Sequence, residues 1–442
     1  MFTINRYIMA KNIRLVIFLI LIIPTTYKAQ IMVIKGAIVQ FNAGAIVSSH
    51  GGTDFTEGST LTNNGTFKIF KNSTLPQSGN LLLNTASTAN GNGLYLIEQD
   101  WINNAFFNAN NSTVELFGST QQFITSTNNT FTTFNNLVLT GNGTGNNRKK
   151  SLLNVDAFIS AGGMLSLNNR ELETQVNDMV VLNPAINSVT NNNTFGSEGF
   201  VSSLAPGYLY RATNSTNAYL FPVGSSAGTL RYRPLLITPK SASAEEYASR
   251  LNNFNSDNDG FFRIQNDGSF LNLNDQFYHS IEQTNGTNNV DLEFFYVNAI
   301  DGDWSSTANW TGALWENMGD VSSGISGGFS SIFKNDWPIN STISPYILSN
   351  LDAELTIPNV FTPNSDGVND LFFINAKNIA EFNIVIVNRW GNVVFETSDI
   401  TVFWDGKFKN ELCTEGTYFY KVIAKAKNKK EYQNQGFISL QY

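Results

Sequence analysis

The sequence predicts an all-β protein of several domains, and three observations support this. The chain is rich in Asn, Thr, Ser and Gly, with only 14% charged residues, and helix interiors disfavour Asn, Thr and Gly. Short apolar runs alternate with polar turn residues along most of the chain. A length of 442 residues suits about two to four domains. We expect an N-terminal β-solenoid-like region, a middle β-sandwich and a C-terminal Ig-like antiparallel β-sandwich.

Residues 1–30 have the features of a signal peptide. Arg6, Lys11 and Arg14 precede a run of nine apolar residues, 15–23, and Ala29 offers a small residue before a cleavage point near Gln30. Nine residues are too few to cross a bilayer as a helix, which needs about 20. We therefore expect export to the periplasm and no transmembrane segment in the mature chain.

Residues 31–204 repeat a pattern of short apolar runs and polar turns, although the sequence itself does not repeat. Short runs such as residues 66–70 and 114–117 are separated by Asn, Gly, Ser and Thr turns. Each run is too small to bury its own face, which is typical of a β-solenoid whose coils stack on one another. One or two antiparallel sandwiches remain the alternative.

The composition changes near residue 205, and we interpret residues 205–350 as a β-sandwich. Residues 291–297 alternate between apolar and polar side chains. Residues 242–253 are the one plausible short helix or lid. Trp304, Trp310, Trp315 and Trp337 fit the packing of a core, and the alternative is a platform that stacks on surface glycans.

Residues 356–442 have alternating runs bounded by turn signals, as in a small antiparallel sandwich. Seven ordered words stand out: IPNVFTPN (357–364), DGVND (366–370), NRWG (388–391), VF (394–395), WDG (404–406), GTYFY (416–420) and GF-I-L (436–440). With these words the stretch resembles the gliding motility-associated C-terminal domain, the type B sorting domain of type IX secretion cargo proteins in Bacteroidetes. Ser365 stands where that family usually has Gly, and Cys413-Thr414 where it usually has Val-Pro.

The resemblance implies a partner and a destination. The type IX secretion machinery would carry the protein from the periplasm across the outer membrane, so that it is secreted or held at the outer cell surface. The residues that would carry this role are Asn364, Asp366, Gly367, Asn369, Asp370, Asn388, Arg389, Trp390, Gly391, Trp404, Asp405 and Gly406. Among them, the glycines permit unusual turn angles, and we expect Trp390 and Trp404 to anchor the core.

Charge and cysteine content limit the partners and the cross-links. The net charge is −8; residues 1–30 hold four basic and no acidic residues and residues 356–442 nine of each, which leaves −12 on residues 31–355. Nucleic-acid binding needs clustered Lys and Arg, so we exclude that class of partner. Cys413 is the single cysteine, so no disulfide can form within the chain.

The sequence contains no catalytic motif, and we predict no enzyme. His50 and His279 are the only histidines, neither lies in a nucleophile motif, and we expect both in turns or at the surface. The passenger (residues 31–350) then fits a non-enzymatic adhesion or binding module, associated with gliding or surface attachment, whose partners are surface glycans or other surface proteins. A polysaccharide-active enzyme, which needs only two close carboxylates, and a purely structural surface fibre remain alternatives.

Two oxygen-rich turns could hold a cation. Asn255, Asp257 and Asp259, followed by Gly260, match the first half of a calcium loop, but Asn266 stands where a bidentate Glu is expected. Calcium is therefore the one cofactor we consider. Residues 364–370 form a second oxygen cluster, whose side chains could instead cap their own turn.

Overall fold

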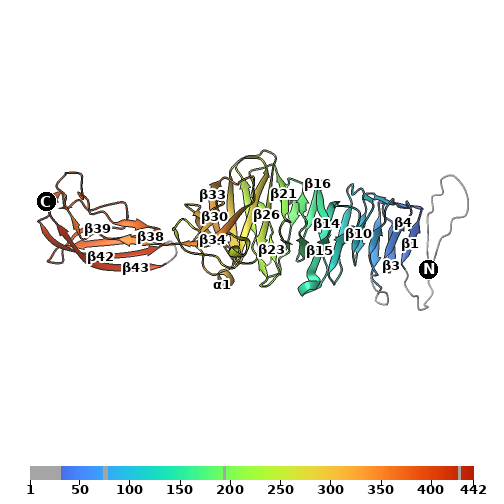
Figure 1. Ribbon diagram of the computed structural model, residues 1–442, viewed down its shortest axis with the longest axis horizontal. Helices are drawn as coiled ribbons and strands as arrows, with labels where there is room; N and C mark the ends of the chain where they lie inside the picture. Colours follow the sequence, from blue (N-terminus) through green and yellow to red (C-terminus); the bar gives the residue numbers. More distant parts are fainter. Residues whose placement is uncertain (1–30, 73–77, 193–195, 427–429) are drawn as a thin grey trace, which may run out of the picture. The chain divides into compact units, whose positions relative to one another are not determined.

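The computed structural model confirms the predicted fold class. It describes residues 31–72, 78–192, 196–426 and 430–442, and the predicted signal peptide lies outside the described residues. Parallel sheets form the N-terminal part and antiparallel sheets follow (Figure 1). The chain divides into two compact units, the first made of Met1–Asp259, Gln276–Asp301 and Ser322–Tyr346 and the second of Gly260–Asp275, Gly302–Val321 and Ile347–Tyr442. The domain boundaries given above stay predictions.

Three parallel sheets build the N-terminal part of the first unit. One sheet is the series β1 (Met32–Lys35), β4 (Thr53–Thr56), β7 (Leu81–Leu83), β10 (Trp101–Asn103), β13 (Gln122–Thr125), β15 (Lys149–Leu153), β17 (Glu171–Gln175) and β20 (Phe200–Ser203). From β1 to β13, strands of this sheet are three apart in sequence order, because each circuit of the chain adds one strand to each sheet. We call this region the coil.

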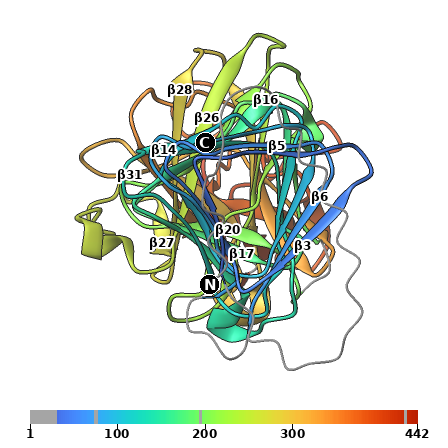
Figure 2. The same ribbon diagram turned by 90° about the vertical axis from the view of Figure 1, so that its right-hand side faces the viewer.

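The other two sheets complete each circuit. One contains β2 (Ile38–Phe41), β5 (Thr60–Asn63), β8 (Thr88–Asn90) and β11 (Phe106–Phe107). The other begins with β3 (Ile46–His50), β6 (Thr66–Phe70), β9 (Leu94–Ile97), β12 (Thr113–Leu116), β14 (Phe131–Leu139), β16 (Asp156–Ser166) and β18 (Met179–Val181). In Figure 2, β5 and β6 lie on different sides of the winding.

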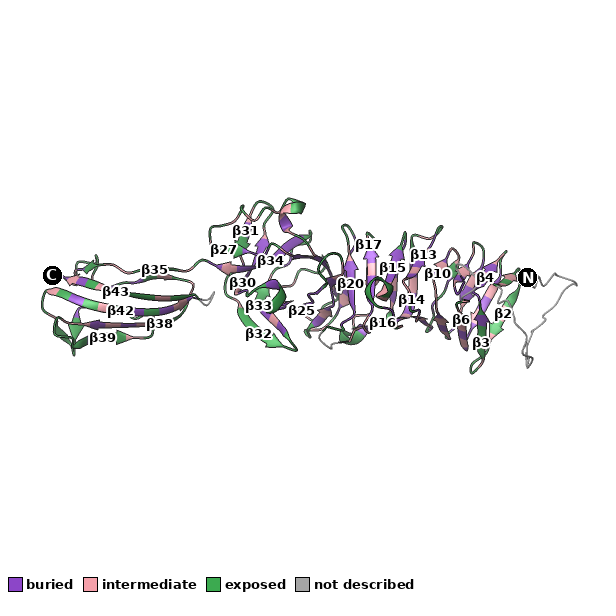
Figure 3. Ribbon diagram, turned by 90° about the horizontal axis from the view of Figure 1, so that it is seen from below, coloured by how far each residue is buried: buried purple, intermediate pink, exposed green. Residues whose placement is uncertain are grey.

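Aromatic side chains fill the inside of the coil. Trp101 is fully buried, and its ring meets Tyr95 of β9 at 5.9 Å, Phe107 of β11 at 4.8 Å and Phe134 of β14 at 5.4 Å between centroids. The alternation of buried and partly exposed residues along each strand places every second side chain inside (Figure 3). Trp101 thus joins all three sheets at one point of the core.

A lysine also lies inside the coil. Lys150 of β15 is fully buried, and its Nζ donates to the carbonyl of Gly118 at 2.9 Å and to Oε1 of Gln122, its register partner on β13. Burial and, after it, the charge of Arg170 lower the pKa of Lys150 to about 7, although the carboxylate of Asp100 acts in the opposite direction.

The coil ends where its sheet changes direction. Strand β21 (Leu209–Thr213) pairs in parallel with β18 and antiparallel with β26 (Glu245–Asn252). Strand β26 also pairs antiparallel with β28 (Tyr278–Asn285). The predicted helix or lid over residues 242–253 is therefore wrong: the segment is a central strand whose backbone is bonded on both sides and whose side chains are mostly buried.

A second antiparallel sheet faces the first one. It contains β22 (Tyr219–Phe221), β25 (Leu235–Pro239), β29 (Val290–Tyr296), β33 (Phe329–Trp337) and β32 (Ser322–Ser326). The rings of His279 on β28 and Phe294 on β29 meet at 5.5 Å between centroids. This contact places His279 between the two sheets.

His279 corrects one expectation. It is buried rather than in a turn or at the surface, and its Nε2 lies 2.9 Å from the carbonyl oxygen of Arg233. Burial lowers the pKa of His279 to about 4, so the ring is neutral at physiological pH. The sequence around a lone histidine contains no signal that its side chain is buried. His50, by contrast, is exposed on β3.

In the second unit, tryptophans pack in the core, as expected for Trp304 and Trp315. These residues are 9% and 0% exposed, and Nε1 of Trp315 donates to the carbonyl of Phe261 at 3.2 Å. Trp315 begins β31 (Trp315–Asn317), which pairs with β30 (Ser306–Trp310). Trp310 is half-buried, and so is Trp337, which belongs to the first unit.

Replacing Trp101 by Ala should lower the free energy of unfolding by about 3–5 kcal/mol, because it removes a large buried side chain and leaves a cavity. Urea unfolding followed by far-UV circular dichroism measures this change. Phe106, 68% exposed on the same coil, is the matched control, and Phe106→Ala should change stability by less than about 0.5 kcal/mol. Similar losses in both variants would contradict the packing described.

Lys150 should make stability depend on pH. The unfolded side chain keeps its ordinary pKa of 10.5 and the folded one has a pKa of about 7, so between these values the unfolded chain binds more protons. The free energy of unfolding should therefore rise with pH across that window, and below about pH 7 this contribution should be constant. Urea unfolding from pH 7 to 10 should show a smaller rise in Lys150→Met than in the wild type or in Lys68→Met, which alters a half-buried lysine of β6. Equal slopes in all three proteins would refute the assignment.

Candidate functional site

The C-terminal part of the second unit is a small domain whose strands are antiparallel except for one parallel pair, β36 (Val360–Phe361) with β43 (Glu431–Leu440). Its main sheet has the order β36, β43, β42 (Gly416–Ala426), β38 (Ile379–Val387) and β39 (Val393–Thr397). Two short pairs accompany it: β35 (Glu354–Thr356) with β37 (Asn375–Lys377), and β40 (Lys407–Phe408) with β41 (Glu411–Leu412). We call residues 355–440 the C-terminal domain.

Trp404 is the centre of the core of this domain, as predicted. It is 1% exposed and its ring packs on Phe361 at 5.2 Å and on Tyr418 at 5.0 Å between centroids. Its Nε1 donates to the carbonyl of Lys407 at 2.9 Å, so the one polar atom of the indole is satisfied. A hydrogen bond within the adjoining turn stabilises it: Oδ1 of Asp405 accepts the N–H of Lys407 at 3.0 Å.

Gly406 brings two of the predicted words together. Its φ is 77°, and a Cβ at this position would lie 2.8 Å from Cγ of Pro363, just before Asn364. Any side chain here would therefore collide with the neighbouring loop as well as strain the turn.

Residues 364–370 form a loop capped by its own carboxylates and amide. Asp370 accepts the N–H of Ser365 at 2.7 Å and of Gly367 at 2.8 Å. Asn364 and Asp366 each accept the N–H two residues ahead, at 3.1 and 2.8 Å. Asn369 has a φ of 54°, and its carbonyl accepts the N–H of Thr362 at 2.8 Å. The side-chain oxygens of this cluster thus accept backbone N–H groups of their own turn, as in the self-capping alternative.

The turn between β38 and β39 exposes a tryptophan. Oδ1 of Asn388 accepts the N–H groups of Trp390 and Asn392, each at 3.0 Å, and Gly391 has φ of 80°. Trp390 is 81% exposed. The prediction that Trp390 anchors the core is therefore wrong, because the hairpin turn lifts this side chain off the sheet while Trp404 fills the core.

Arg389 extends from this turn toward the start of β42. A Cβ on Gly416 would lie 3.0 Å from a terminal guanidinium nitrogen of Arg389. A shallow hollow next to it is lined by Asn388, Arg389, Trp390, Thr414, Thr417 and Tyr418. The structure thus joins the NRWG turn and the GTYFY strand at one end of the domain.

Of the predicted calcium ligands, Asp257 and Asp259 lie in a short 3₁₀ turn, Ser256–Asp259, and Asn255 directly precedes it. Oδ1 of Asn255 accepts the N–H of Asp257 at 3.0 Å, and a carboxylate oxygen of Asp259 accepts the hydroxyl of Tyr278. The side-chain oxygens of Asn255 and Asp259 therefore already bind protein groups, and Asp257 also has a partner. Within the described ranges, no group of three or more His, Cys, Asp or Glu residues could hold a metal ion. Calcium binding stays a prediction.

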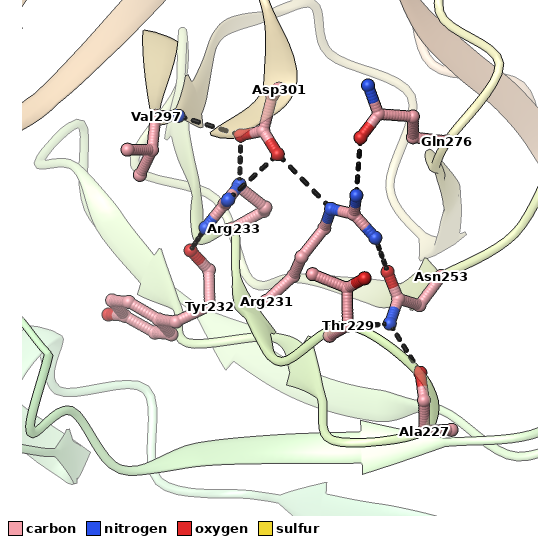
Figure 4. A network of polar contacts seen from close by, with 9 residues as sticks. All are labelled: Ala227, Thr229, Arg231, Tyr232, Arg233, Asn253, Gln276, Val297 and Asp301. Carbon is pink, nitrogen blue, oxygen red and sulfur yellow. Dashed lines mark hydrogen bonds and ion pairs between the residues drawn. The ribbon is translucent and has the colours of Figure 1, made fainter. Parts of the chain in front are cut away.

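The most charged buried cluster in the sandwich is a carboxylate between two arginines (Figure 4). Asp301 of α1 (Asn298–Asp301) accepts Nε of Arg231 at 3.1 Å, a terminal nitrogen of Arg233 at 2.8 Å and the N–H of Val297 at 2.8 Å. All three charged side chains are buried, and Arg231 also donates to Asn253 at 2.8 Å. This arrangement holds loops together and leaves Asp301 no lone pair aimed at solvent.

Comparison with known proteins identifies the class of the C-terminal domain. Residues 355–440 match the CHU_C family, described as a type IX secretion signal domain. The resemblance drawn from the sequence words is thereby confirmed for this part of the chain. No curated protein and no solved structure was found to match the chain.

A domain of this class implies that the protein is a secreted or surface cargo of the type IX secretion system. Its C-terminal domain implies interaction with the secretion machinery and secretion across the outer membrane to the surface or exterior of the cell. In the part of the chain that the structure describes, no helix is both long enough and apolar enough to cross a membrane.

Replacing the two tryptophans of the C-terminal domain should change its stability to very different extents. Trp404→Ala removes a buried side chain and should lower the free energy of unfolding by about 3–5 kcal/mol. Trp390→Ala alters an exposed side chain and should change it by less than about 0.5 kcal/mol. Urea unfolding of the two full-length variants gives both values, and a large loss in Trp390→Ala would show that this side chain packs after all.

Proposed function

We propose that the passenger is a non-enzymatic binding module, displayed at the cell surface for adhesion or attachment associated with gliding. Its partners would be surface glycans or other surface proteins. The observation that carries the proposal is that three buried groups able to do acid–base chemistry are engaged inside the sandwich. His279 is buried and neutral, Asp301 is clamped between two arginines, and Glu245 accepts hydrogen bonds from Tyr247 and Asn288.

The tryptophans favour this proposal over a polysaccharide-active enzyme. Such an enzyme would need two close carboxylates, and exposed aromatic faces beside them would hold the sugar. Trp304 and Trp315 instead lie in the core, at 9% and 0% exposure.

The coil supplies a surface suited to binding. Outward positions align from strand to strand, so that Ile38, Thr60, Thr88 and Phe106 form one row across β2, β5, β8 and β11. Ile38 and Phe106 are 81% and 68% exposed, and neighbouring strands are about 4.8 Å apart. A row with this regular spacing can contact an extended polymer at several points.

Binding and catalysis can be separated with the purified full-length protein. Incubated with insoluble polysaccharides and with whole cells, it should be retained saturably and should release no new reducing ends. Phe106→Ala, which should keep its stability, should be retained more weakly, and heat-unfolded protein gives the background. Release of reducing ends or of unsaturated sugars by the folded protein would overturn the proposal in favour of an enzyme.

A further inference from the structure

We propose that the secretion machinery contacts the C-terminal domain through an aromatic patch at one end of its main sheet. The patch consists of Val387 on β38, Trp390 in the following turn, Val393 on β39, Phe419 on β42 and Phe437 on β43. The proposal rests on the export role of this domain and goes further by naming the surface that is read.

Strand register places four of these residues in one row. Phe437 pairs with Phe419, Phe419 with Val387, and Val387 with Val393. Side chains that are directly opposite on neighbouring strands lie on the same face of a sheet. Trp390 lies in the turn that joins Val387 to Val393, so it extends the row at its β38–β39 end.

This face of the row points to solvent. Trp390 is 81% exposed, Phe437 57%, Phe419 47% and Val393 44%. Tyr418 and Ile438, which are adjacent to Phe419 and Phe437 in sequence, are buried on the opposite face. Single exposed apolar residues are ordinary, but a row of exposed apolar and aromatic residues on neighbouring strands indicates an interaction site.

The patch occupies only one end of the sheet. Further along β42, Lys421 pairs with Gln435, and Lys425 pairs with Glu431 and lies 3.4 Å from a carboxylate oxygen of Glu381. Beyond the patch this face is therefore mostly polar and charged, with Ile423 as a single exposed apolar residue between Lys421 and Lys425. This is expected for a bounded docking surface and not for a face that is buried along its whole length.

Arg389 and the hollow beside Trp390 give the patch a polar border. Trp, Tyr and Arg are the residue types that contribute most to binding at protein interfaces, and an apolar centre with a polar rim is the usual arrangement. Thr414 and Thr417 line the same hollow and supply hydroxyl groups at that rim.

Three of the words that carry the family resemblance meet in this patch. NRWG contributes Trp390, GTYFY contributes Phe419 and the last word contributes Phe437. Other members of these words, such as Tyr418 and Leu440, are buried and have a packing role. The exposed aromatics have no such role, and a shared partner of domains of this class accounts for their presence.

The partner is the machinery rather than a charged surface or a second copy. The domain carries nine basic and nine acidic residues, so net charge offers no attraction to a polyanion or a polycation. The family match supplies one partner that every such domain has to meet, the type IX machinery. An aromatic contact matches a recognition step that does not depend on charge.

The test compares surface delivery of full-length variants in a cell with the type IX system. Trp390→Ala, Phe419→Ser and Phe437→Ser should each lower the surface or extracellular fraction at least tenfold, with the protein accumulating in the periplasm, whereas Trp390→Phe should restore delivery. Ile423→Ser, at a 51% exposed position on β42 away from the row, is the matched control and should be delivered normally. Cell fractionation and surface protease accessibility measure the fractions, and urea unfolding of each purified variant checks that it folds.

Deleting residues 355–442 separates the possible failures. If the deletion blocks delivery but folded Trp390→Ala and Phe419→Ser reach the surface normally, the patch is not the contact and the export role stands. If the deletion itself is still delivered, the export role fails as well. If the patch variants export normally but lose a concentration-dependent dimer in light scattering, the patch binds a second copy and the proposal is wrong.

Discussion

In-register pairing between successive circuits is the constraint on which the coil depends. Each strand takes its backbone hydrogen bonds from the circuits before and after it, so a side chain that is inside in one circuit has to meet inside positions in the next. Gly163 shows how close the circuits come even where the register of β14 and β16 shifts, between Ile159 and Met164: a Cβ there would lie 1.8 Å from the carbonyl oxygen of Asn135 in the neighbouring circuit. Trp101 shows the other consequence, because one large ring can link all three sheets only when the register is kept.

The same constraint explains how the coil can join an antiparallel sandwich. Strand β21 has one edge bonded in parallel to β18 and the other bonded antiparallel to β26. The sheet therefore continues while its topology changes, and no edge of β21 is left open. The buried Arg211 on this strand donates to the carbonyls of Leu220 in β22 and of Ile186 in a 3₁₀ turn, Ile186–Ser188, so a charged side chain also links these elements at the junction.

Local patterns predicted the strands, while tertiary context decided what the sequence left open. Alternation identified β29 and β38, and the words around Trp404 located a core that the structure contains. Residues 242–253 contain Glu245, Glu246 and Arg250, which suggested a helix, but two neighbouring strands and the burial of Tyr247 override that preference. The sequence did not distinguish the burial of Trp390 from that of Trp404, since each lies one or two residues before a glycine in a turn. Only the position of each turn relative to the sheet decides which indole is covered. The alternation within GTYFY, Tyr418 inside and Phe419 outside, was the signal that could have identified the exposed row.

The way in which Trp390 is exposed bears on how a signal domain can be recognised. An exposed side chain on a mobile loop would lose conformational entropy on binding, and that loss weakens recognition. Here the turn is fixed before any partner arrives: Asn388 accepts two N–H groups of the turn, and Asn388 and Asn392 are joined by a backbone hydrogen bond of 2.9 Å. Phe419 and Phe437 sit on paired strands at the centre of the sheet and are held equally firmly. Asx turns, strand register and one buried tryptophan thus give this domain a rigid aromatic surface, although its chain forms no disulfide. A rigid surface of this kind can act as an export signal that does not depend on the passenger.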